Sequence, residues 1–146
     1  MIRAKAQGPH VYYWIKTDYK GNKALSLEGT LRISNFNPHD ENQLFRFEVV
    51  GSNNYAIQNS SIIINNWSGK ALDIPGSTFK HGERIIQWSK HKKWNQRWYI
   101  QKDPKGYVIK SAMNALVLDI AEEKRENGAK VVQWEQSGGM NQYWMP

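Results

Sequence analysis

The apolar residues of this chain come in short runs that polar and turn-forming residues separate. The runs span two to four residues and are rich in β-branched or aromatic side chains, which favours β-strands. The predicted strands cover residues 12–15, 55–57, 62–64, 85–88, 99–100, 107–109 and 131–134. Turn signals at 20–22, 51–54, 67–70, 103–106 and 137–139 suit an all-β barrel or sandwich. Only residues 121–126 have helical propensity, and so short a segment predicts a single turn.

A repeat with a constant offset of 46 residues relates two parts of the chain. Residues 71–74 (Ala-Leu-Asp-Ile) correspond to 117–120 (Val-Leu-Asp-Ile), and residues 85–88 (Ile-Ile-Gln-Trp) correspond to 131–134 (Val-Val-Gln-Trp). The same offset carries the Asn-Gln-x-Trp segment at 95–98 onto that at 141–144. In both copies the Asp-to-Trp spacing is 15 and the Trp-to-Asn spacing is 7. Spacings preserved in this way indicate two copies of one structural unit.

A third, degenerate copy lies upstream. Residues 24–27 (Ala-Leu-Ser-Leu) correspond to the Asp segment and residues 42–45 (Asn-Gln-Leu-Phe) to the Asn-Gln-x-Trp segment, with about six residues fewer between them. In this alignment Ser26 replaces the Asp, Asn35 replaces the first Trp and Phe45 replaces the second. The length of 146 residues fits one domain, with repeats at roughly 10–53, 54–106 and 107–146.

The composition narrows the class of protein. Seven Trp and seven Tyr against four Phe favour a binding surface, because both side chains combine a flat apolar face with a polar group. The absence of Cys excludes disulfides, thiolate metal sites and a cysteine nucleophile. No apolar run approaches the roughly 18 residues of a membrane span, and no signal peptide is evident. We therefore expect a soluble chain without membrane insertion, cytoplasmic or secreted by a non-classical route.

The residues also argue against catalysis. No hydrolase, metalloprotease, phosphate-loop or dinucleotide fingerprint is present. The two repeated Asp belong to different repeats, and threefold symmetry would separate them beyond the spacing that glycoside hydrolysis requires. The four His show no metal-ligand spacing. We expect neither an enzyme nor a bound metal or cofactor.

A threefold repeat of about 46 residues, each made of four short strands and ending in Gln-x-Trp, resembles the ricin-type lectin family. The resemblance covers essentially the whole chain and is carried by the two complete copies at matched spacing. It implies a β-trefoil fold with pseudo-threefold symmetry. It also implies glycan partners that present galactose or N-acetylgalactosamine, bound in repeats two and three.

The resemblance implies a role for each repeated residue. Trp88 and Trp134 would stack on the sugar, Asp73 and Asp119 would accept hydrogen bonds from two adjacent hydroxyls, and Asn95 and Asn141 would bind the same hydroxyls. Gln96 and Gln142 would brace the Asp and the local turn. His91 would add a supporting contact at the second site, where the third repeat has Ser137, and Trp94 could do so where the third repeat has Met140.

Each of these residues also has a purely structural interpretation. An Asp in such a segment can bond the backbone of a turn, and an exposed Trp can pack at the rim of a barrel. We favour the binding role for both pairs because their spacing is matched. Trp98, Trp144, Leu72 and Leu118 are expected in the core instead. The first repeat, which lacks both the Asp and the Trp, is expected to have no sugar site.

The net charge of +7 is concentrated in one segment. Residues 80–110 hold nine Lys and Arg against two acidic residues, and the rest of the chain is balanced. The basic cluster Lys90, His91, Lys92 and Lys93 therefore has three interpretations, in order of preference: ordinary solvation, a preference of the second site for anionic glycans, or nucleic-acid binding.

The sequence leaves other possibilities open beside the sugar-binding hypothesis. The chain could be a basic module for anionic polymers, with nucleic acid the least favoured partner, or the targeting domain of a larger toxin or glycosidase. A homodimer also stays open, because small lectins of this type often dimerise, but no residue marks an interface.

Overall fold

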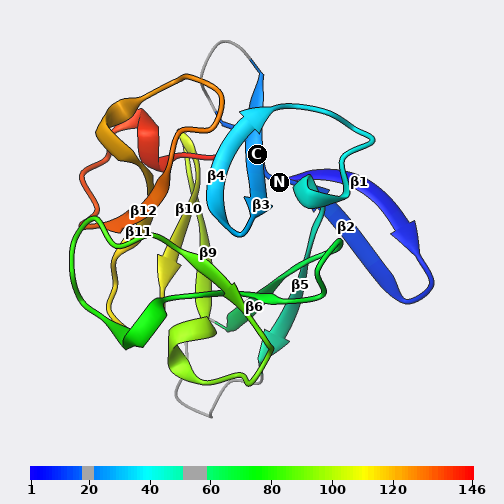
Figure 1. The fold of residues 1–146 in the computed structure, drawn as a ribbon, viewed down its shortest axis with the longest axis horizontal. Helices are drawn as coiled ribbons and strands as arrows, with labels where there is room; N and C mark the ends of the chain where they lie inside the picture. Colours follow the sequence, from blue (N-terminus) through cyan, green and yellow to red (C-terminus); the bar gives the residue numbers. More distant parts are fainter. Residues whose placement is uncertain (18–21, 51–58) are drawn as a thin grey trace.

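The computed structural model describes residues 1–17, 22–50 and 59–146. Within these ranges the chain forms β-strands and short 3₁₀ turns, without an α-helix (Figure 1). The strands are β1 (Ile2–Gln7), β2 (His10–Trp14), β3 (Lys23–Glu28), β4 (Thr30–Asn35), β5 (Phe45–Val50), β6 (Ser60–Asn65), β7 (Ala71–Asp73), β8 (Ile86–Trp88), β9 (Trp98–Asp103), β10 (Gly106–Ser111), β11 (Val117–Ile120) and β12 (Val131–Trp134). The 3₁₀ turns are η1 (Glu41–Gln43), η2 (Pro75–Ser77), η3 (Trp94–Gln96), η4 (Ala121–Glu123) and η5 (Met140–Gln142).

The strands fall into three equivalent groups that follow the repeats. β2 to β5, β6 to β9, and β10 to β12 each contain a hairpin between an inner pair of strands, and all the pairs are antiparallel. The third group ends in a single bridge residue, Trp144, in place of a fourth strand. Trp144 pairs with Tyr107 of its own repeat and with Thr17 of the first repeat, which joins the end of the barrel to its beginning.

The three hairpins meet around a pseudo-threefold axis. Each hairpin pairs with the next one through a single bridge, and the bridges are Thr30 to Ile86, Arg84 to Val132, and Arg32 to Lys130. This arrangement is the β-trefoil that the sequence led us to expect.

The core contains one large side chain from the end of each repeat. Phe45, Trp98 and Trp144 are completely buried in a single apolar cluster, together with leucines and isoleucines from every hairpin. Leu72 and Leu118, predicted to be core residues, are also completely buried. Aromatic groups of this size dominate the energetics of a small core, so these positions hold the three repeats together.

Most of the predicted strands coincide with observed ones. The segment 131–134 is β12, 62–64 lies within β6, and the predicted helical turn at 121–126 is the 3₁₀ turn η4. The predicted strand 55–57, the turn signal 51–54 and most of the signal at 20–22 lie outside the described residues. The pattern missed β1, whose apolar positions Ile2, Ala4 and Ala6 alternate with polar residues but include only one large side chain.

The structure corrects the alignment of the first repeat. Ala24 pairs with Ser34, as Ala71 pairs with Trp88 and Val117 with Trp134. Ser34, and not Asn35, therefore occupies the position of Trp88 and Trp134. Eight positions separate Ser26 from Ser34, against fifteen between Asp73 and Trp88, so the hairpin β3–β4 alone carries the deletion. The following connection to η1 is one residue longer than its counterparts, which hid this register in the sequence.

No helix in the described part of the chain is long and apolar enough to cross a membrane.

Candidate functional site

Two pockets occupy equivalent places in the second and third repeats. The pocket of the second repeat, here called the β-site, has a volume of about 410 Å³ and is lined by Asp73, Trp88, His91, Lys93 and Asn95, with η2 at its rim. The pocket of the third repeat, here called the γ-site, has a volume of about 550 Å³. Its lining includes Asp119, Trp134, Ser137 and Asn141, with η4 at its rim. Each pocket thus gathers an Asp, an Asn and a Trp that the repeat predicted.

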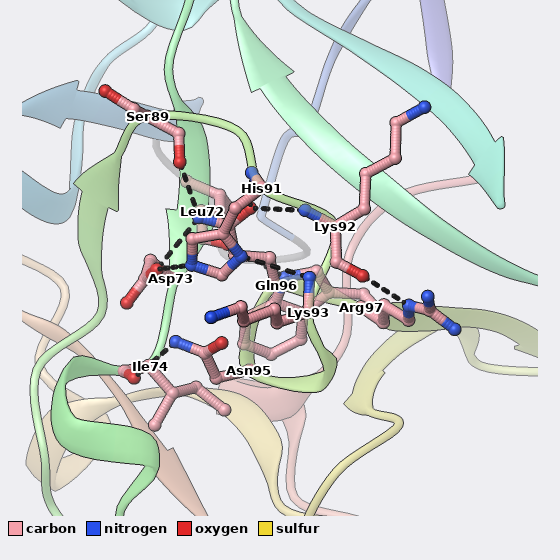
Figure 2. A network of polar contacts seen from close by, with 11 residues as sticks. Leu72, Asp73, Ile74, Ser89, His91, Lys92, Lys93, Asn95, Gln96 and Arg97 are labelled. Atoms are coloured by element: carbon pink, nitrogen blue, oxygen red, sulfur yellow. Dashed lines mark hydrogen bonds and ion pairs between the residues drawn. The ribbon is translucent and has the colours of Figure 1, made fainter.

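The two aspartates are held in the same way. Gln96 Nε2 donates to Asp73 Oδ2 at 2.9 Å and to the Ser89 carbonyl at 3.0 Å. Gln142 Nε2 donates to Asp119 Oδ2 at 2.8 Å and to the Glu135 carbonyl at 2.9 Å. Both glutamines are buried beneath the pockets and do not line them. Figure 2 shows this network around Asp73. The glutamines therefore fix one oxygen of each carboxylate.

The two asparagines lie next to the aspartates. Asn95 Nδ2 donates to the Ile74 carbonyl, and Asn141 Nδ2 donates to the Ile120 carbonyl, each at 3.2 Å. This bond uses one N–H of the amide and fixes the plane of the side chain. Each asparagine also acts on the carboxylate of its pocket, because a side-chain hydrogen bond from Asn95 lowers the pKa of Asp73 and one from Asn141 lowers that of Asp119. The carbonyl oxygen of each amide can still accept a bond from a ligand.

The tryptophans divide into two classes. Trp88 and Trp134 are 58% and 42% exposed and form the apolar side of their pockets. Trp98 and Trp144 are completely buried, and Trp98 Nε1 donates to the Leu72 carbonyl at 3.3 Å. A flat, half-exposed indole beside a buried carboxylate is a surface that can bind an amphipathic ring.

His91 completes the β-site. Its Nδ1 accepts a hydrogen bond from the Lys93 backbone N–H at 3.0 Å, which leaves the proton on Nε2. Nε2 faces Asp73 Oδ2 at 3.6 Å (Figure 2). At the γ-site, Ser137 stands in the place of His91, and the Ser137 hydroxyl accepts a hydrogen bond from the Gly139 N–H at 3.2 Å. Trp94 does not line the β-site, and Met140 does not line the γ-site. The Arg97 guanidinium lies over the Trp94 ring, 4.6 Å from its centroid.

The positive charge is more dispersed than the sequence suggested. Lys90 and Lys92 turn away from the β-site toward Glu48 of the first repeat, with N···O distances of 2.8 and 3.6 Å. Lys105 donates to the Gly138 carbonyl of the third repeat at 3.1 Å. Of the three clustered lysines, Lys93 alone lines the pocket. Within the basic cluster, Lys93 and His91 are therefore the residues that give the β-site its positive character.

The rims of the two pockets differ in charge. Gly76 and Ser77 of η2 correspond to Glu122 and Glu123 of η4, and all four residues have a positive φ between 50° and 62°. A left-handed backbone is energetically unfavourable for residues other than glycine. The surrounding structure therefore holds the rim in this conformation at both sites. The γ-site has an acidic rim, balanced in part by Lys130, and the β-site has His91 and Lys93.

Burial raises the pKa of both aspartates, while the hydrogen bonds from Gln96 and Gln142 oppose the rise. Glu123 raises the pKa of Asp119 further, whereas His91 lowers that of Asp73. Because the folded state favours the protonated form, these two carboxyl groups stabilise the fold at pH values below their ordinary pKa of 3.8. This contribution is lost as the pH rises from 3.8 through the raised values.

Ligand binding to a carboxylate should show the opposite pH dependence. We expect ligand binding to weaken as the pH falls toward the raised pKa values of the two aspartates. Tryptophan fluorescence titrations between pH 7 and pH 4 measure this, with the melting temperature followed in parallel. Affinity that stayed constant down to the ordinary carboxyl pKa of 3.8 would contradict it.

The first repeat has neither the aspartate nor the exposed tryptophan of the other two. Ser26 is completely buried, and Arg32 lies opposite it where the other repeats have Ile86 and Val132. The brace persists, since Gln43 Nε2 donates to the Asn35 carbonyl at 2.8 Å and its Oε1 accepts from the Asn37 N–H at 2.9 Å. The glutamine is thus part of the fold in all three repeats, with or without a pocket above it.

Sequence reasoning missed the residues that reach a pocket from elsewhere in the chain. The rim residues of η2 and η4 follow the Asp directly, and their alignment at the same offset could have indicated them. Gly82 of the second repeat lines the γ-site, which belongs to the third repeat. No spacing within a repeat points to such a contact.

Comparison with known proteins agrees with this geometry. The family described as "Ricin-type beta-trefoil lectin domain-like" matches residues 41–134 and 94–146. The chain therefore belongs to this family of β-trefoil lectin-like domains. Membership of this family is evidence for carbohydrate binding. No curated protein sequence matches the chain.

Several solved structures share the fold. A designed threefold-symmetric protein, ThreeFoil, is 25% identical with a TM-score of 0.80, and the match covers 92% of this chain and 96% of that one. A Polyporus squamosus lectin, bound to the epitope Neu5Acα2-6Galβ1-4GlcNAc, is 25% identical with a TM-score of 0.78. This match covers 97% of this chain but 49% of the lectin chain. An exo-β-1,3-galactanase from Clostridium thermocellum is 24% identical, with a TM-score of 0.76 and coverage of 90% and 29%. The chain thus spans only part of two of these proteins.

Proposed function

We propose that the protein is a non-catalytic lectin that binds galactose or N-acetylgalactosamine residues of glycans at the β-site and the γ-site. One observation carries the proposal: the same set of Asp, Asn and half-exposed Trp recurs in two pockets. In each pocket an equivalent buried glutamine, Gln96 or Gln142, makes the same hydrogen bonds. A structural role in a turn would not require an exposed indole beside each carboxylate.

The geometry suits galactose for a chemical reason. The axial 4-hydroxyl of this sugar leaves a continuous C–H face, which can stack on Trp88 or Trp134. The second oxygen of the aspartate and the carbonyl oxygen of the asparagine can then bind two adjacent hydroxyls on the opposite edge of the ring. A charged acceptor strengthens such bonds, and its fixed position selects the orientation of the hydroxyls.

Each site alone should be weak. A monosaccharide that covers one indole and makes a few hydrogen bonds binds near 1 mM, which corresponds to about 4 kcal/mol. Two sites on one domain can raise the avidity for a multivalent surface by about 10² or more. Free galactose should therefore inhibit binding to a glycan-coated surface poorly.

A glycan array combined with titration of single sugars tests the proposal. Glycans that end in galactose or N-acetylgalactosamine should bind, and those that end in glucose or mannose should not. An array on which no galactose- or N-acetylgalactosamine-terminated glycan binds would contradict the sugar class, even though the fold stands.

The rim charges favour a difference between the sites. His91 and Lys93 face the β-site, whereas Glu122 and Glu123 face the γ-site. Glu122 and Glu123 would repel an acidic substituent on the galactose, whereas His91 and Lys93 would tolerate it. We therefore assign neutral galactosides to both sites and sulfated or sialylated ones to the β-site first.

A second candidate function is binding of anionic polymers through the basic cluster. Its support is the cluster itself, but Glu48 already pairs with Lys90 and Lys92. Replacing Glu48 by Gln would free both ammonium groups, and exposed pairs of this kind change affinity by about two- to fivefold. Heparin affinity at low salt measures this. If E48Q left heparin binding unchanged while Trp88→Ala removed glycan binding at the β-site, the polymer function would be excluded.

A further inference from the structure

A loop of the second repeat lies against the sugar-facing tryptophan of the third repeat. This segment, residues 78–83, is here called the cross-repeat loop. Gly82 lines the γ-site, and a Cβ atom at Gly82 would lie 3.5 Å from Trp134 Cζ3. The His81 ring meets the Trp134 ring at a centroid distance of 5.0 Å and an interplanar angle of 54°. The indole of the γ-site is thus supported by a different repeat.

The loop is held in place by one buried side chain. Gln133 Nε2 donates to the carbonyls of Thr78 and Lys80 at 3.1 and 2.8 Å, and its Oε1 accepts from Asn114 Nδ2 at 2.9 Å. The backbone of Gln133 pairs with the loop as well, through bonds with Gly82 and Glu83 at 2.8 and 3.0 Å. This network gives the cross-repeat loop a defined position beside Trp134.

Among the residues that the structure describes, no such loop lies at the β-site. By the threefold arrangement, its support would come from the β3–β4 hairpin, but this hairpin turns directly through Glu28-Gly29-Thr30. Gln87, the counterpart of Gln133, has a buried Oε1 without a hydrogen-bond partner among the described residues. Trp88 is correspondingly more exposed than Trp134, at 58% against 42%. Three separate observations therefore mark the same difference between the pockets.

We infer that His81 is a positioning residue of the γ-site, which fixes the Trp134 ring so that this site binds galactosides more tightly than the unsupported β-site. The inference rests on the proposed function and adds a residue from another repeat to one of its two sites. The physical reason is that a ring held in its bound orientation loses less freedom when the sugar stacks on it.

Single-site backgrounds make the test specific. Asp73→Asn leaves the γ-site alone, and Asp119→Asn leaves the β-site alone. In the first background, H81A should weaken the affinity for methyl β-galactoside and lactose by about 2- to 12-fold, the range expected for one aromatic pair. In the second background it should change nothing. His81→Phe, which keeps a ring, should restore most of the affinity. Phe79→Ala is the matched control, because Phe79 lies in the same loop, is 64% exposed and forms no ring pair with Trp134 among the described residues.

The indole N–H signals of Trp88 and Trp134 in an NMR spectrum give a readout that needs no sugar. H81A should shift the Trp134 signal and leave the Trp88 signal in place. Equal weakening in both backgrounds, no weakening in either, or an unmoved Trp134 signal would overturn the inference. If neither background binds any galactoside, the proposed function fails. The positioning of Trp134 by His81 is then decided by the indole signals alone.

Discussion

Replacing Asp73 and Asp119 together by Ala should remove glycan binding while the fold stays intact. Each carboxylate offers one free oxygen to the ligand, and bonds to charged groups contribute about 1.5–3 kcal/mol each. Against a total of about 4 kcal/mol for one monosaccharide, this loss lowers the affinity of each site by about 13- to 160-fold. Titration calorimetry with lactose and binding to a galactose-coated surface both measure the effect.

The Asn variants provide the control for folding. An Asn at position 73 or 119 can still accept the bond from Gln96 or Gln142, but it has no second acceptor for the sugar. It also removes a buried carboxylate whose raised pKa makes the charged form unfavourable in the folded protein. The double Asn variant should therefore lose binding and melt at the same or a higher temperature at pH 7. Retained glycan binding with intact folding would remove these pockets from the proposal.

Replacing Trp98 by Ala should instead destabilise the whole fold. The side chain is completely buried in the core and donates to the Leu72 carbonyl, so truncation leaves a large cavity and an unpaired acceptor. Such substitutions cost about 3–5 kcal/mol. For a domain of this size the melting temperature should fall by roughly 10 °C.

Trp88→Ala is the matched surface substitution, with the same change of residue at a half-exposed indole. Its free energy of unfolding should stay within about 0.5 kcal/mol of the parent, while binding at the β-site is lost. Urea denaturation followed by circular dichroism compares the two variants. Equal losses of stability would mean that the division into core and ligand-facing tryptophans is wrong.

The sequence predicted most of the fold because the repeat itself carries the information. The constant offset placed Asp73, Trp88 and Asn95 in register with Asp119, Trp134 and Asn141, and the structure brings each set to one pocket. The buried glutamines and the core tryptophans also lie where the repeat indicated. Whether these residues bind a sugar stays a prediction that the experiments above must decide.

Three features could not be read from the sequence, each for a physical reason. The place of the deletion in the first repeat depends on strand register, which a degenerate segment with Ser34 and Asn35 side by side does not fix. The neutralisation of Lys90 and Lys92 depends on Glu48, which is more than forty positions away in the chain. The contact of His81 with Trp134 crosses a repeat boundary and follows no internal period.

The shortened β3–β4 hairpin has a consequence for how such a chain can change. A repeat that is copied as a unit carries its own carboxylate and indole, but it leaves behind the segment that supports its indole. An insertion or deletion in one hairpin therefore changes the support of the tryptophan in the following repeat. Building a third site into the first repeat would require an Asp at position 26 and a Trp at position 34. Lengthening that same hairpin would strengthen a different site, the one around Trp88.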